Sequence, residues 1–157
     1  MRKIRKKMHS RTENSLDITL DITAKRMQDG VMERECISYA GTRHMVGDKY
    51  YLRYKESIGK GQKEVPSMIV VGENEIRIHR TGALKSDLIF SPEEDHECPY
   101  TTPMGIISLT TRTKSLDIFI DEKKLDIYLN YELFSNGSLI SENEINIISN
   151  CINHAFS

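Results

Sequence analysis

The chain has 157 residues, 38% of them hydrophobic and 29% charged, with a formal net charge of −1. This length and composition indicate one soluble globular domain with a core of its own, and they exclude a disordered or disulfide-dependent chain. A net charge near zero also disfavours nucleic acid as a partner for the molecule as a whole.

The first residues form a short basic arm. Within seven positions they carry five cations, namely Arg2, Lys3, Arg5, Lys6 and Lys7. Residues 9–14 are polar, so the arm lacks the apolar stretch that a signal peptide needs, and no later run is long and apolar enough to span a bilayer. We expect a mobile arm over residues 1–14 of a cytoplasmic protein with no membrane partner.

Three cysteines, Cys36, Cys98 and Cys151, are spread widely along the chain. Their odd number and the lack of a paired motif argue against a disulfide framework. This usage is typical of a reducing compartment and supports the cytoplasmic location.

Period-two alternation of apolar and polar residues dominates the chain. Successive strand side chains point to opposite faces, so such a segment buries one face and leaves the other in water. In chain order, we expect extended segments at residues 16–27, 32–46, 49–57, 66–71, 75–80, 85–90, 100–103, 106–120, 124–134 and 145–149.

Tight turns separate most of these segments. Asn136-Gly137 is the strongest hairpin dipeptide, because both turn positions need positive φ. Gly41 marks a predicted bulge, and residues 114–115 a predicted bend. We expect Gly105 to sit where a side chain would collide with a neighbouring strand.

Together the segments predict an all-β fold, an antiparallel up-and-down barrel of about 8–10 strands. Closure of the sheet would leave no edge strand open to aggregation. No linker divides the chain, so we expect one barrel domain over residues 15–150 and a C-terminal tail over residues 151–157.

Three stretches carry a family resemblance: residues 51–56, residues 78–83, and Tyr100-x-Thr102-Pro103-x-Gly105 running into residues 111–115. In this order and spacing they resemble the YwiB-like bacterial proteins, a domain of unknown function with a lipocalin-like (calycin-like) barrel. The resemblance extends from residue 16 to residue 147. It implies the barrel fold and no activity, and Met104 stands where it implies an aromatic residue.

Strand alternation places two charged residues on apolar faces. Arg80 shares a face with Ile76 and Ile78, and Glu56 shares one with Leu52 and Tyr54. Both therefore point toward the barrel interior, where an ionised side chain needs a partner because an unpaired buried charge is very costly.

Two interpretations of these charges stay open. With Tyr54, Tyr100 and Tyr131 nearby, Arg80 and Glu56 could form a polar patch that binds a carboxylate or phosphate of a small ligand, because guanidinium offers a planar fork of donors. Alternatively the two charges form a structural ion pair. We expect the pair.

Other chemistries find little support in the sequence. Residues 95–98, Asp-His-Glu-Cys, could contribute metal ligands, but no paired Cys or His motif accompanies them, so a solvated acidic loop is the expectation. We identify no catalytic constellation, no metal site and no cofactor motif.

Two functions follow from the barrel. The first is a non-enzymatic protein that binds a small, partly apolar or anionic ligand in its lumen. The alternative is a packed barrel that acts as a macromolecular interaction module through its outer surface or its basic arm. An open lumen would favour the first and a filled lumen the second.

Overall fold

The computed structural model describes residues 15–58, 63–82 and 84–152. These residues contain ten strands and no helix, so no helix among them could cross a membrane. The strands are β1 (Leu16–Gln28), β2 (Val31–Val46), β3 (Lys49–Ile58), β4 (Lys63–Val71), β5 (Ile76–Arg80), β6 (Lys85–Phe90), β7 (His96–Thr102), β8 (Gly105–Ile120), β9 (Lys124–Ser135) and β10 (Ser138–Cys151).

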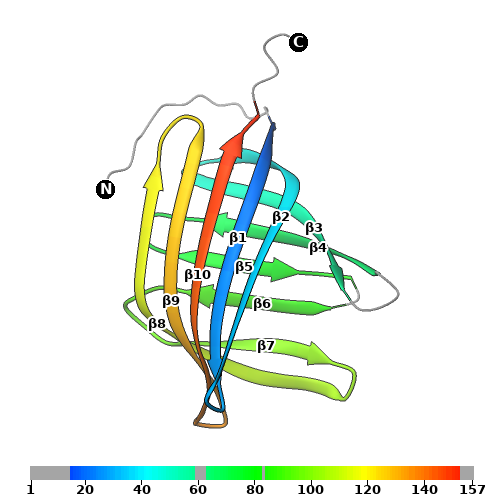
Figure 1. Ribbon diagram of the computed structural model, residues 1–157, viewed down its shortest axis with the longest axis vertical. Coiled ribbons are helices and arrows are strands. Elements are labelled where there is room, and N and C mark those ends of the chain that lie inside the picture. Colours follow the sequence, from blue (N-terminus) through cyan, green and yellow to red (C-terminus); the bar gives the residue numbers. More distant parts are fainter. Residues whose placement is uncertain (1–14, 59–62, 83, 153–157) are drawn as a thin grey trace.

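Every strand pairs with its neighbours in sequence, and β1 pairs with β10, so the antiparallel sheet closes on itself. The predicted barrel and strand number are confirmed. In Figure 1, β8, β9, β10 and β1 run side by side, and β3 to β7 cross behind them. The β1–β2 and β9–β10 turns lie together at the lower end of this view.

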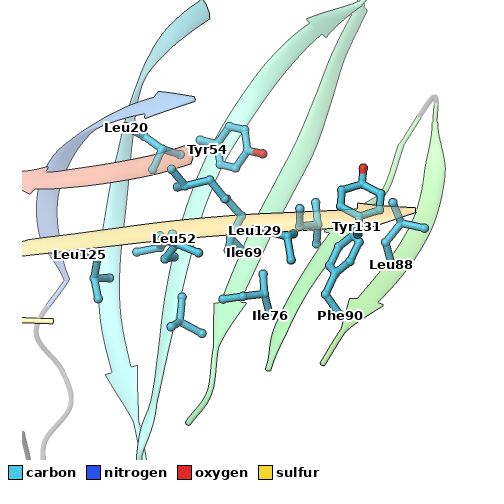
Figure 2. Packing of buried hydrophobic residues seen from close by; sticks show 14 of the residues in the cluster. Leu20, Leu52, Tyr54, Ile69, Ile76, Leu88, Phe90, Leu125, Leu129 and Tyr131 are labelled. Atoms are coloured by element: carbon cyan, nitrogen blue, oxygen red, sulfur yellow. The ribbon is translucent and has the colours of Figure 1, made fainter. Parts of the chain in front are cut away.

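The upper half of the lumen is filled by branched apolar side chains. Leu20, Leu52, Ile69, Leu125 and Leu129 are fully buried there and belong to one cluster (Figure 2). Each occupies an alternate position in its strand, as a barrel requires of its inward residues. Burial of a side chain of this size contributes about 1.5–3 kcal/mol.

Arg43 closes the upper end of this core. It is buried, donates from Nη1 to the Cys151 sulfur at 3.5 Å and from Nη2 to the Glu122 carbonyl at 3.2 Å, and lies over the Tyr50 ring. Carbonyl, thiol and aromatic groups make these contacts. The Asp121 carboxylate is also near enough for the charge of Arg43 to help lower its pKa.

Several strands are longer than predicted. β4 begins at Lys63 and carries Pro66 within it, β7 takes in residues 96–98 of the predicted acidic loop, and β10 extends from Ser138 to Cys151. β10 is long because it supports both β9 and β1, which local composition does not reveal. Its last residue also lies inside the predicted C-terminal tail.

The turn and bend predictions are mostly confirmed. Asn136 and Gly137 have φ of 52° and 79°. A register shift between Thr113 and Ser115 marks the predicted bend in β8. The bulge predicted at Gly41 is wrong, because β2 pairs with β1 through this glycine without a shift.

Gly105 and Gly41 are glycines for reasons other than the predicted ones. A Cβ on Gly105 would meet nothing within 4 Å, so no neighbouring strand excludes a side chain there; its φ of +125° is what favours glycine. The close approach lies instead at Gly41, where an added Cβ would collide with the Arg53 carbonyl oxygen and lie 3.3 Å from the Tyr54 Cβ.

Gly41→Ala should therefore destabilise the barrel by about 2 kcal/mol, because the two backbones cannot separate without breaking the β2–β3 ladder. Thermal unfolding followed by circular dichroism measures this loss. Gly72→Ala is the matched control, since its added Cβ would have no neighbour nearer than 3.6 Å. Equal melting temperatures for the two variants would contradict the proposed crowding at Gly41.

Candidate functional site

A row of polar residues crosses the inner wall of the barrel from β3 to β7. Tyr54 lies opposite Ser67, Ser67 opposite Arg80, Arg80 opposite Ser86, and Ser86 opposite Tyr100. Because directly opposed residues share a face of the sheet, all five point inward. The apolar core ends at this row.

A single carboxylate oxygen organises the row. Glu56 Oε2 accepts from Arg80 Nε at 2.8 Å, from the Ser67 hydroxyl at 3.0 Å and from the Tyr54 hydroxyl at 3.3 Å. We call these four residues the polar cluster. The predicted pairing of Arg80 with Glu56 is confirmed, and their side chains are only 22% and 15% exposed.

Burial and charge together set the protonation of the polar cluster. Burial disfavours the charged form of Arg80, but the charge and hydrogen bond of Glu56 outweigh it and raise the pKa of the guanidinium. Burial is also the main reason that the pKa of Tyr54 is raised, with the negative charge of Glu56 as the second cause. Arg80 is therefore a cation and Tyr54 a neutral donor.

A second polar row lies on the facing wall. Thr113 of β8 is opposite Tyr131 of β9, Tyr131 is opposite Asn143 of β10, and Asn143 is opposite Arg26 of β1. Arg26 in turn lies opposite Glu33 of β2 and donates to its carboxylate at 2.7 Å. Each wall thus carries one arginine–glutamate pair.

The lower half of the lumen holds a cavity of about 650 Å³. Residues of β1, β2, β9 and β10 line this cavity. The inward ones are Ala24, Arg26, Glu33, Glu35, Tyr131, Asn143 and Ile145, and Lys25 and Arg34 lie at its edge. We call this region the open half of the lumen. Its lining residues lie toward the β1–β2 and β9–β10 turns, which Figure 1 shows together at the lower end of the barrel.

Tyr131 joins the cavity to the apolar core. Its ring packs on Phe90 with centroids 4.5 Å apart, and its hydroxyl points away from Phe90 in Figure 2. Burial raises the pKa of Tyr131 to about 12, while the charges of Arg80 and Arg26 oppose this shift. Both arginines are therefore close enough to act on the one tyrosine.

Of the five predicted lumen residues, three belong to the polar cluster: Tyr54, Glu56 and Arg80. Tyr131 lines the cavity, and Tyr100, half-buried, lies opposite Ser86. Ser67 and Asn143 were not predicted from the sequence. Ser67 could have been found, because it lies on the same face of β4 as Val65 and Ile69, whereas Asn143 precedes the segment that was predicted to be a strand.

The side chains of the Asp-His-Glu-Cys stretch, residues 95–98, do not converge on one site. Asp95 pairs with Arg112 at 2.9 Å, His96 lies 2.7 Å from the Ser91 hydroxyl, and Cys98 is buried in the core. No group of three metal-ligating side chains comes together in the part of the chain that the structure describes. The basic arm over residues 1–14 lies outside the described residues.

The outer face of the barrel carries a second cavity, of about 670 Å³, over β3, β4 and β5. Ala40, Arg53, Met68 and His79 contribute to its lining. Ala40 and Ala24 thus lie on opposite sides of the same β1–β2 wall, one facing the outer groove and one facing the lumen.

Comparisons with known proteins agree with this architecture. A family model described as a domain of unknown function, DUF1934, matches residues 18–147. The uncharacterized beta-barrel protein YwiB of Bacillus subtilis (strain 168) is 29% identical over 116 residues, which cover 74% of this chain and 80% of the relative.

The crystal structure of the ywiB protein from Bacillus subtilis is also similar, with a TM-score of 0.79 at 24% sequence identity. The match covers 88% of this chain and 94% of the other. At this identity the likeness shows the fold alone.

Removing either charge of the polar cluster should destabilise the barrel. We expect Arg80→Met and Glu56→Gln each to lower the free energy of unfolding by up to about 3 kcal/mol, because each leaves a largely buried partner uncompensated. In the double variant the losses should fall short of additivity by about 1 kcal/mol or more. Urea denaturation measures all three. Unchanged stability in Arg80→Met would contradict a structural pair.

Tyr131 should titrate near pH 12, well above the ordinary range of a tyrosine and below Tyr54, whose pKa is raised further. Because its pKa is about 10 in the unfolded chain, its contribution to stability is complete below about pH 10 and is lost as the pH rises through about 12. Phenolate absorbance in wild type and Tyr131→Phe measures this. If the variant lacks absorbance near pH 10 rather than near pH 12, the burial argument is wrong.

Proposed function

Because the chain belongs to the DUF1934 family, a domain of unknown function, we propose a function from the geometry of its own barrel. It is a cytoplasmic, non-enzymatic protein that binds a small, partly apolar ligand in the open half of its lumen. The observation that carries this proposal is the cavity beside Tyr131, whose volume lies in the range of small-molecule sites.

The lining of the cavity suits a ligand with both apolar and polar parts. Ile145, Ala24 and the Tyr131 ring offer apolar surface, whereas Asn143 and the two arginine–glutamate pairs offer polar groups nearby. Binding sites for small molecules typically combine apolar walls with a few fixed polar groups. A lumen filled throughout would instead favour the alternative of a packed interaction module.

The pairing of the inward charges bears on the charge of the ligand. Arg80 donates to Glu56, and Arg26 donates to Glu33. A ligand carboxylate or phosphate would meet neither guanidinium without a competing carboxylate beside it. We therefore favour recognition through apolar contact and hydrogen bonds over recognition of an anion.

A hydrolytic role has one geometric candidate, and its geometry argues against it. The Ser91 hydroxyl lies 2.7 Å from His96 Nε2, and the Glu94 carboxylate is 4.0 Å from that same nitrogen. A catalytic triad needs the carboxylate on the other ring nitrogen, where it orients the base. Neither Ser91 nor His96 lines either cavity described above.

The protein purified from its own cells and examined by native mass spectrometry should retain a small molecule. Ala24→Leu should abolish retention, because the added side chain enters the cavity, whereas Ala40→Leu should leave it intact. Both variants should keep the barrel, as far-ultraviolet circular dichroism would show. Retention lost in Ala40→Leu but kept in Ala24→Leu would place the ligand in the outer groove and refute the proposal.

A further inference from the structure

The wall of the barrel splits between β2 and β3. The ladder that joins these strands ends where Thr42 lies opposite Arg53. Beyond that point, residues 31–41 of β2 pair with β1 alone, and residues 54–58 of β3 pair with β4 alone. In Figure 1 the two strands diverge, with β2 reaching the lower end of the barrel and β3 crossing behind it. Each strand therefore has an edge that no other strand of the described residues covers.

The uncovered edge of β2 is open to pairing. A strand edge without a neighbour presents free backbone N–H and C=O groups, which native proteins protect with proline, charged side chains or bulges. Residues 36–40 carry no charge and no proline, and they pair with β1 without a register shift. Ile37, although it points inward, is 37% exposed. This stretch therefore lacks the protections that keep another chain from adding to it.

The outer groove of about 670 Å³ lies at this split. Ala40 from the uncovered part of β2 and Lys55 from the uncovered part of β3 both line it. On the inner side of the wall, the ring of Tyr39 on β2 packs on the ring of Tyr54 on β3, with centroids 4.8 Å apart. A strand added to β2 from outside would therefore run beside the groove, with every second side chain on the groove side.

The lining of the outer groove is basic. Arg53, Lys55 and His79 contribute to it, and no acidic side chain does. Outside the lining, Glu64 lies 3.8 Å from the Lys55 ammonium, and Asp87 lies 3.6 Å from the His79 ring. Arg53 forms no ion pair within the described ranges of the chain. Surface pairs of this kind contribute little, so a carboxylate that enters the groove meets cations that are free or easily shared.

We propose that the split binds an extended, acidic segment of a partner protein, which adds to the uncovered edge of β2 as a further strand. Its backbone pairs with residues 36–40, and acidic side chains at every second position lie toward Arg53 and Lys55. The basic arm of this chain has the wrong sign of charge for the groove. The site lies outside the lumen, so it is independent of the small-molecule site proposed above.

Three fluorescent octapeptides test the chemistry of the partner: one alternates glutamate with valine, one glutamine with valine and one lysine with valine. Fluorescence anisotropy measures their affinities for the full chain. We expect the glutamate peptide to bind about tenfold more tightly than the glutamine peptide, because its carboxylates complement the basic lining, and the lysine peptide to bind least. Added salt should weaken the glutamate peptide, because exposed charges are screened.

Matched variants test the groove. Arg53→Gln and Lys55→Gln together should weaken the glutamate peptide about tenfold. Lys49→Gln should leave its affinity unchanged, because Lys49 lies on the same outer face of β3 but does not line the groove. Ala40→Leu should also weaken binding, because the added side chain enters the groove, whereas Ala24→Leu, inside the lumen, should not.

Hydrogen exchange tests whether the peptide adds as a strand. The bound glutamate peptide should slow amide exchange in residues 36–40, because alternate amides of this edge gain a partner. Exchange in residues 42–46 should not change, because this part of β2 is already paired on both sides. Binding without slower exchange in residues 36–40 would mean that the peptide contacts side chains alone, and strand addition would be wrong.

Other results would also overturn the proposal. They are failure of the glutamate peptide to bind at millimolar concentration, equal affinity for the glutamine peptide, and tighter binding of a single-stranded oligonucleotide, which would assign the basic groove to nucleic acid. A dimer in sedimentation that Ala40→Leu makes monomeric would place a second copy of this chain in the split. None of these results affects the lumen site, because retention of a small molecule is lost in Ala24→Leu and not in Ala40→Leu if that proposal is right.

Discussion

Every second side chain of ten strands has to fit inside one closed sheet, and this constraint shapes the rest of the molecule. In the upper half, branched residues such as Leu52, Ile69 and Leu129 are fully buried and pack in one cluster. In the lower half, the inward positions change to arginine, glutamate, serine, asparagine and tyrosine, which do not pack as a hydrocarbon core does. The cavity lies where the inward residues change from apolar to polar. The same period-two alternation places both sets of residues inside the barrel.

The charges of the two arginine–glutamate pairs are balanced within each pair, Arg80 with Glu56 and Arg26 with Glu33. Glu56 accepts three donors on one oxygen, which balances Arg80 and also fixes Tyr54 and Ser67. Hydrogen bonds of this kind hold the side chains of the polar cluster in fixed positions at the end of the apolar core.

Much of the fold could be read from short stretches of sequence. The alternation in residues 16–27 and 124–134, the Asn136-Gly137 turn and the bend at residues 114–115 all have local causes, and the structure bears them out. The inward facing of Arg80 and Glu56 followed from the same alternation. Besides the strand boundaries, the predictions for Gly41 and Gly105 were wrong. A neighbouring strand requires glycine at position 41 and a backbone angle favours it at position 105, and neither cause is visible in a single strand.

The sequence by itself determined the class of fold, the strands and the face of each strand on which a residue lies, because period two is a property of the local backbone. Only the tertiary structure decided which inward residues meet. Residue register around a closed sheet depends on all ten pairings together, including the β1–β10 closure between distant parts of the chain. That closure brings Arg26 beside Asn143 and Tyr131, and so makes a cavity from residues that no local pattern connects.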